Sequence, residues 1–304
     1  MNSLQTDRKT VIKKARIQAK RNLSGWILMF VPLLLFIMIV WRPLLMGISY
    51  SFFKLKGFTP TEFVGLQNFI DVITDTDFPQ TLMNTVKYVV WSLVIGMPLP
   101  FLVAVMLNEM IHGKNFFRFT MYIPVIVPII ATSLIWKEIY LGGSGGLLNI
   151  ALSYFGISPV DWLSNKNLVI PLIIVSMTWH GFGGTVIMYL ATMQSINQEL
   201  YEAARLDGAG LLTCVRHVMM PHMGGTVLLL AIKQIISVFS VTEQPLVMTG
   251  GGPNGASMSL GLTNYFYAFK YGQFEKSMAL GVISFMFMLI LTFIYFQVDK
   301  KLSD

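Results

Sequence analysis

Several apolar stretches of about twenty residues constrain what this chain can fold into more than any other feature. An α-helix of about 20 residues is long enough to cross the roughly 30 Å hydrocarbon core of a bilayer. The whole chain of 304 residues is 54% hydrophobic and only 12% charged, and its mean hydropathy is +0.64. A soluble domain of this length needs far more polar surface. The apolar stretches therefore predict membrane-spanning helices.

Six stretches qualify as spans, and each is bounded by polar or Gly/Pro-rich residues. They cover approximately Trp26–Phe53, Thr85–Leu107, Phe119–Ile139, Leu168–Met193, Thr226–Val241 and Met278–Val298. The first is too long for a signal peptide and lacks a small-residue cleavage pattern, so we expect it to be retained. The predicted fold is an all-α polytopic membrane protein. Residues 1–25 form a basic tail, 26–298 the six-helix transmembrane domain and 299–304 a second tail.

The distribution of lysine and arginine predicts the orientation of the chain in the membrane. The tails and even-numbered loops hold thirteen of these residues, and the odd-numbered loops hold six. Basic residues gather on the cytoplasmic side of membrane proteins, so both termini are expected in the cytoplasm. The net charge of +7 is explained by these basic flanks, without a nucleic-acid partner. Arg42 and Lys87 lie near the outer ends of their spans, from which their side chains can reach the interface.

The fifth span is the most polar of the six. It contains Lys233, Gln234 and Ser237, and Glu243 and Gln244 follow at its end. A cation inside a bilayer needs a protein partner or water, so this helix is expected to line a polar cavity or to pack in the bundle centre. Ordinary hydrogen bonding between helices is the alternative. Pro245 and the glycine-rich run after it are expected to end the helix.

A polar segment, residues 194–225, separates the fourth span from the fifth. Ser195 or Asn197 is expected to cap a short helix, and Gly208 permits the left-handed turn that ends it. A second helical stretch then continues toward Pro221. Exposed carboxylates and small side chains on this helix-turn-helix would suit docking of another protein, although a polar loop is ordinary in any polytopic protein. The residues expected to dock are Glu202, Ala203, Ala204, Asp207, Gly208 and Pro221.

The residue inventory argues against several functional classes. Cys214 is the only cysteine and there is no CxxC motif, so neither an intramolecular disulfide nor a metal site is indicated. His180 is the only histidine in a span and has no carboxylate at helical spacing, which disfavours an intramembrane enzyme. No GxxxxGK[ST] motif is present, so the chain is not expected to bind ATP. A receptor or structural scaffold remains a further class.

Four motifs resemble those of a known family. The sequence EAARLDGAG at 202–210, followed by Pro221, resembles the EAA loop of ABC importer permeases. FVGLQNF at 63–69, YIPVIVP at 122–128 with Trp136 and GLLN at 146–149, and MTGGGPNGAS at 248–257 resemble stretches of its sugar-permease, MalF/MalG-like branch. The resemblance covers about residues 20–300. Cys214 or Val215 stands where a large aromatic residue is usual, and Met220 where leucine is common.

The resemblance implies a type I ABC importer (MetI-like) fold in a bacterial plasma, or inner, membrane. It implies a second homologous permease subunit, two ABC ATPase subunits that bind the ATP, and an extracytoplasmic solute-binding protein. One ATPase would dock on the 202–216 loop of this chain. No cofactor of its own is implied. The expected substrate is a di- or oligosaccharide, and amino acids, polyamines or glycerol phosphates are the alternative.

Residues of the fourth and fifth spans are the candidates for the substrate path. Sugars need ring stacking and paired hydrogen-bond donors and acceptors, which aromatic, amide and hydroxyl side chains supply. The candidates are Trp179, Lys233, Gln234, Ser237, Phe239, Glu243 and Gln244. For Trp179 and Phe239, packing in the bundle is the alternative interpretation.

Overall fold

The structure is a computed structural model that describes residues 25–26 and 28–303, with side chains up to residue 298. The predicted basic tail lies almost wholly outside these residues. A helix over Leu28–Tyr50 contains a π-helical turn, η1 (Ile37–Trp41), and α2 (Arg42–Tyr50). The other helices are α3 (Gln67–Ile73), α4 (Phe78–Gly96), α5 (Pro98–Glu109), α6 (Lys114–Ile126), α7 (Ile129–Ile139), α8 (Leu147–Ser153), α9 (Val169–Ser195), α10 (Gln198–Leu206), α11 (Leu211–Cys214), η3 (Val215–Met219), α12 (Met220–Phe239), α13 (Glu243–Thr249), α14 (Leu260–Tyr265), η4 (Phe266–Lys270) and α15 (Phe274–Ser303).

Within the described residues, five helices are long and apolar enough to cross a membrane, and a bent pair can provide a sixth crossing. The five are Leu28–Tyr50, Phe78–Glu109, Val169–Ser195, Leu211–Phe239 and Phe274–Val298. Each of the six predicted spans therefore overlaps one of the five long helices or the bent pair, with one change of shape and several changed boundaries.

The third predicted span, Phe119–Ile139, is not one straight helix. It comprises α6 and α7, which meet at an angle of 98°. Val127 and Pro128 between them have extended backbone, because a proline disfavours helical conformation in the residue before it. The hydropathy of residues 119–139 is high enough for a membrane span. The positions of its prolines explain why the helix breaks between α6 and α7.

The fifth predicted span begins and ends earlier than expected. The helix starts at Leu211 rather than Thr226, and it runs through Pro221. Pro221 has no amide hydrogen to donate to the preceding turn, and the π-helical turn η3 directly before α12 accommodates this irregularity. The helix ends at Phe239 rather than near Pro245, which instead lies inside the separate helix α13.

A small hairpin departs from the all-α prediction. Strand β1 (Phe53–Lys56) pairs antiparallel with β2 (Thr59–Phe63) directly after the first span. The buried Asn68 side chain donates to the carbonyls of Ser51 and Phe53, each at 2.9 Å, and so fixes the base of the hairpin. One amide of the FVGLQNF motif therefore has a structural role.

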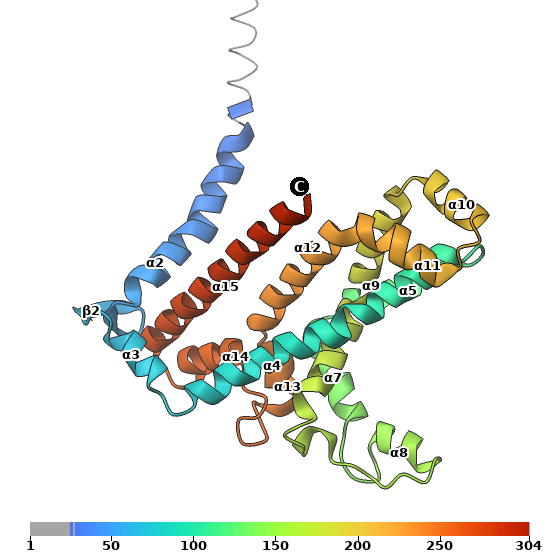
Figure 1. Cartoon of the computed structure of the whole chain (residues 1–304). Helices are drawn as coiled ribbons and strands as arrows, with labels where there is room; N and C mark the ends of the chain where they lie inside the picture. Colours follow the sequence, from blue (N-terminus) through green and yellow to red (C-terminus); the bar gives the residue numbers. More distant parts are fainter. Residues whose placement is uncertain (1–24, 27, 304) are drawn as a thin grey trace, which may run out of the picture.

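The bundle packs around α9, which contacts α4, α5 and α6, while α12 packs against α4 and α15 (Figure 1). The largest buried cluster joins α5, α9 and α12 through residues such as Leu107, Leu190 and Met223. Figure 1 shows α10 and the C-terminal end at one end of the molecule, and α8 and β2 toward the other. The described N-terminal end points the same way as the C-terminal end, as an even number of crossings requires.

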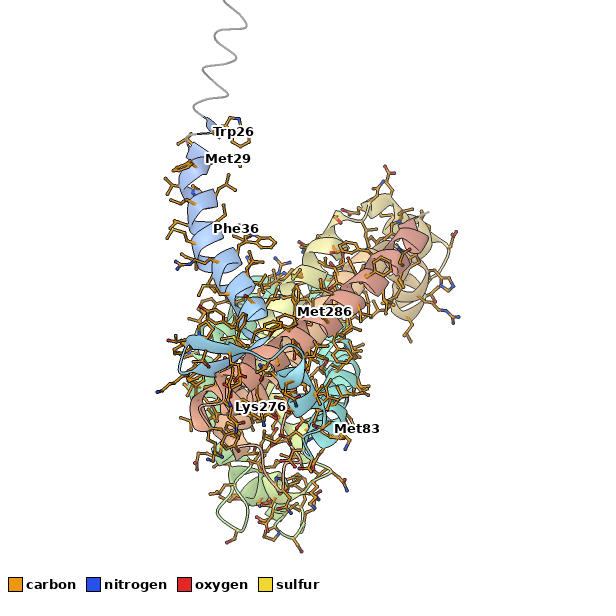
Figure 2. The ribbon with its side chains drawn as sticks, turned by 90° about the vertical axis from the view of Figure 1, so that its left-hand side faces the viewer. Trp26, Met29, Phe36, Met83, Lys276 and Met286 are labelled. Atoms are coloured by element: carbon orange, nitrogen blue, oxygen red, sulfur yellow. The ribbon has the colours of Figure 1, made fainter. Side chains whose placement is uncertain are left out.

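The N-terminal helix stands apart from the rest of the bundle. Figure 2 shows Trp26, Met29 and Phe36 along its outer part, where the helix projects away from the other elements. None of its apolar residues over Leu28–Tyr50 is buried within this chain. Only its inner end, α2, packs against α15 and β1. The part of the helix before α2 is therefore exposed to lipid or to another membrane protein.

Candidate functional site

A polar cavity of about 240 Å³ lies between α4, α9 and α12, and Lys233 and Ser237 of its lining are exposed. Residues three or four positions apart share one side of a helix, so Lys233 and Gln234 each lie on the same side of α12 as Ser237. The lining residues are Gly96, Met97, Ile129, Met177, His180, Gly181, Thr185, Leu230, Lys233, Gln234, Ser237 and Gln244. Four of the seven predicted path residues are thus brought together: Lys233, Gln234, Ser237 and Gln244.

The position of the Gln234 side chain depends on a glycine of the facing helix. A Cβ atom on Gly96 would lie 2.9 Å from Nε2 of Gln234 and 3.3 Å from Oγ1 of Thr178. The missing side chain therefore leaves room for the amide at the contact of α4, α9 and α12. Sequence reasoning did not find Gly96, because nothing in an apolar stretch marks one glycine as a neighbour of a distant polar residue.

His180 is a second lining residue that sequence reasoning did not assign to the path. Its Nδ1 atom lies 3.5 Å from the hydroxyl oxygen of Thr132 on α7. The signal that could have found it was present, since a histidine inside an apolar span normally faces the bundle interior or a water-filled cavity.

Three predicted path residues lie outside the polar cavity. Trp179 lines a neighbouring apolar cavity of about 450 Å³, where its ring packs edge-on against Trp136 at 5.9 Å. Phe239 is buried and its ring lies 6.1 Å from that of Phe287. Glu243 is exposed at the start of α13. The position of Phe239 matches packing, the alternative interpretation, whereas Trp179 is 41% exposed at the wall of its cavity.

The lining of the polar cavity determines which solutes it can accept. Amides, hydroxyls and an imidazole donate and accept hydrogen bonds, and Lys233 is the one charged residue among the described lining residues. No carboxylate lines the described part of the cavity. The arrangement suits a neutral, hydrogen-bonding solute or an anion, and it disfavours a cation.

The predicted docking segment has the local structure that its sequence indicates. Asn197 caps α10, since its side-chain oxygen accepts from the amide of Glu199 at 3.1 Å. Gly208 has a φ of +79°, and the amide of Ala209 donates to the carbonyl of Ala204 at 2.9 Å. The left-handed residue ends the helix as expected.

The surface of α10 is available to another protein. Glu202, Ala203, Asp207 and Gly208 are exposed, Ala204 is half-buried, and Pro221 is exposed in the first turn of α12. Two leucines beside them, Leu206 and Leu212, are 89% and 85% exposed. Apolar side chains exposed among polar ones are typical of a protein interface.

Two contacts hold α10 against the bundle. Arg205 and Glu109, at the end of α5, form an ion pair at 2.9 Å. The Tyr201 hydroxyl donates to the carbonyl of Met193 at 3.4 Å, and burial, with the nearby charge of Glu109, raises the pKa of this tyrosine. Movement of α10 is thereby linked to both α5 and α9.

Comparison with known proteins identifies the family. Residues 96–304 match the family described as binding-protein-dependent transport system inner membrane component. The multiple sugar-binding transport system permease protein MsmF of Streptococcus mutans is 31% identical over 91% of this chain and 95% of its own length. The trehalose/maltose transport system permease protein MalF of Thermococcus litoralis is 30% identical over 91% and 94%.

A solved structure supports the fold. One chain of a bacterial alginate ABC transporter, in complex with an alginate pentasaccharide-bound periplasmic protein, superposes with a TM-score of 0.82 at 21% identity. The match covers 94% of this chain and 97% of that one. The described spans, the polar cavity and these matches agree, and the chain belongs to the family of inner membrane components of binding-protein-dependent transport systems.

Proposed function

We propose that this chain is the permease subunit of an ATP-driven importer and that it translocates a carbohydrate, a di- or oligosaccharide, through the polar cavity. The observation that carries the proposal is the set of hydrogen-bonding side chains that α9, α12 and α13 bring to one cavity. Bidentate amides and hydroxyls match the donor and acceptor pattern of sugar hydroxyls. The curated relatives named above are sugar permeases, which supports the same substrate class.

The lining of the cavity argues against polyamines, one of the alternative substrate classes. A polyamine carries several positive charges, and Lys233 would repel it where no described carboxylate offers compensation. Glycerol phosphates and amino acids carry an anionic group that Lys233 could attract, so they compete with sugars on electrostatic grounds. The names of the relatives favour the sugars over these two classes.

The proposed assembly contains a second homologous permease subunit, two ATPase subunits and a solute-binding protein. The N-terminal helix supports the second permease, because its apolar surface over Leu28–Tyr50 is not covered by this chain. The exposed face of α10 would receive one ATPase, with Glu202, Ala203, Ala204, Asp207 and Gly208 at the contact and Pro221 beside it. The ATPases would hold the ATP, both termini would face the cytoplasm, and the solute-binding protein would deliver the sugar at the opposite end.

Substitution of a cavity residue tests the proposed path. We expect Gln234→Leu to reduce ATP-dependent sugar uptake in proteoliposomes at least about tenfold, since a single lost hydrogen bond to a polar substrate costs about that much. Gln297→Leu, on an exposed position of α15, is the matched control and should leave uptake unchanged. Equal uptake by both variants would show that the substrate does not pass this residue.

A further inference from the structure

A second polar cavity lies at the end of the molecule opposite α10. Its volume is about 190 Å³, and it forms where the loop before α4 meets α14 and η4. The orientation proposed above places this end outside the cytoplasm. Its walls carry two aspartates, several uncharged polar groups and three aromatic rings. The proposed transport path between α4, α9 and α12 does not use any of these residues.

Two aspartates, Asp75 and Asp77, supply the acidic groups of the cavity wall. Asp75 accepts hydrogen bonds from the Tyr267 hydroxyl at 2.9 Å and from the amide of Asp77 at 3.0 Å. Burial, together with the bond to Asp75, raises the pKa of Tyr267, which therefore stays protonated and keeps donating. Among the described residues, neither carboxylate has a lysine, arginine or histidine within ion-pair distance.

One buried hydroxyl in the same walls is left without a partner. The Thr263 hydroxyl oxygen is fully buried and has no partner among the described residues. A buried polar group without a hydrogen bond is unfavourable by about 1–3 kcal/mol. This hydroxyl therefore points to a ligand that supplies the missing partner.

The aromatic walls show which kind of charge the cavity favours. Lys270 of this chain already lies 4.4 Å from the ring centre of Phe266 and 5.4 Å from that of Tyr271. Lys276 lies 5.8 Å from the ring centre of Tyr267. A cation is attracted to the face of an aromatic ring, most strongly where carboxylates reinforce the attraction. The aromatic rings, carboxylates and hydrogen-bond acceptors of the wall together suit a basic side chain.

We propose that this cavity receives an arginine or lysine side chain of the solute-binding protein when that protein docks on the outer face. The occupant is a side chain rather than a metal ion, because Met258 and three rings form much of the wall and a hard divalent cation prefers an all-oxygen shell. An arginine fits best, since its planar group can stack on a ring and bind a carboxylate at once. The identity of the partner rests on the proposed function.

The test measures the affinity of the assembled transporter, in nanodiscs, for the solute-binding protein encoded with it. We expect Asp77→Asn to raise the dissociation constant about tenfold or more, as is typical when one member of an interfacial charge pair is removed. Asp77→Glu keeps the charge and should retain most of the affinity. Glu62→Gln, exposed on β2, removes the same charge elsewhere and should leave the affinity unchanged. An unchanged dissociation constant for Asp77→Asn would overturn the proposal.

Further measurements separate the possible failures. If Asp77→Asn does not assemble, Tyr271→Ala removes an exposed ring from the wall, and it should weaken binding several-fold. A wild-type complex that does not bind its solute-binding protein would refute the proposed function itself. A wild-type transporter whose thermal unfolding is raised by millimolar calcium chloride, while Asp77→Asn shows no such rise, would identify a metal site and overturn the side-chain proposal.

Discussion

The shape of the polar cavity depends on single residues, of which Gly96 is the clearest example. An added methyl group there would meet the Gln234 amide, which is the end of a flexible side chain and can move aside. We expect Gly96→Ala to displace the amide and to raise the KM for sugar uptake several-fold, with little loss of thermal stability. Gly184→Ala on α9, where a Cβ meets nothing within 4 Å, is the control. Equal KM values for the two variants would contradict this role of Gly96.

Single residues also mark where sequence reasoning reaches its limit. Lys233, Gln234 and Ser237 could be predicted to face one cavity, because polar residues inside an apolar span have few tolerable positions. The sequence could not show whether Trp179 and Phe239 contact sugar or pack in the bundle, because an aromatic ring suits either environment. Asn149 shows a third case. Its buried amide binds Val160 and Trp162 and organises the loop after α8.

At the scale of elements, the geometry of α10 depends on how the helix ends. Gly208 has a φ of +79°, which costs other residues roughly 1–2 kcal/mol. We expect Gly208→Ala to shift the end of α10 and to weaken co-purification of the ATPase, while membrane insertion is preserved. Gly210→Ala, at a φ of −73° with open space around it, should have no effect. Normal ATPase retention in Gly208→Ala would count against α10 as the docking element.

The ion pair between α5 and α10 permits a test of mechanical linkage. Both side chains are partly exposed, so the pair itself stabilises the fold by about 1 kcal/mol at most. We expect Glu109→Arg to leave the melting temperature nearly unchanged but to reduce the stimulation of ATP hydrolysis by the loaded binding protein. Combining it with Arg205→Glu should restore stimulation. If the double exchange is no better than the single one, the pair does not link the two helices functionally.

The boundaries of elements were less predictable than their existence. Hydropathy over about twenty residues is a property of the sequence alone, so each predicted stretch coincides with one of the five long helices or with the bent pair. The bend between α6 and α7 depends on packing as well as on Pro128. A Cβ on Gly183 would collide with the backbone of Met121 and Tyr122, so α6 lies directly against α9. This close approach brings together residues about sixty positions apart in the sequence, so no local sequence pattern predicts it.

At the scale of the whole molecule, the N-terminal helix indicates that the chain is one part of an assembly. We expect Phe36→Cys, in a Cys214→Ser background and labelled on its thiol with a photoactivatable maleimide, to be cross-linked to the second permease subunit in native membranes. Phe36 is exposed within this chain and lies on the projecting part of the helix (Figure 2). A cysteine at Ile111, exposed in the loop between α5 and α6, serves as the control. If the cysteine introduced at position 36 reacts with lipid-soluble probes but gives no cross-link to another subunit, the helix does not contact a second permease there.

The most direct measurement of the central claim is the ATPase activity of the assembled transporter in liposomes, with its solute-binding protein, across mono-, di- and oligosaccharides. We expect stimulation by one class of di- or oligosaccharide, and loss of coupled sugar uptake in Gln234→Leu. Amino acids and glycerol phosphates, included in the same panel, should have no effect. Stimulation by one of these, with a flat response to every sugar, would contradict the assignment of a carbohydrate substrate.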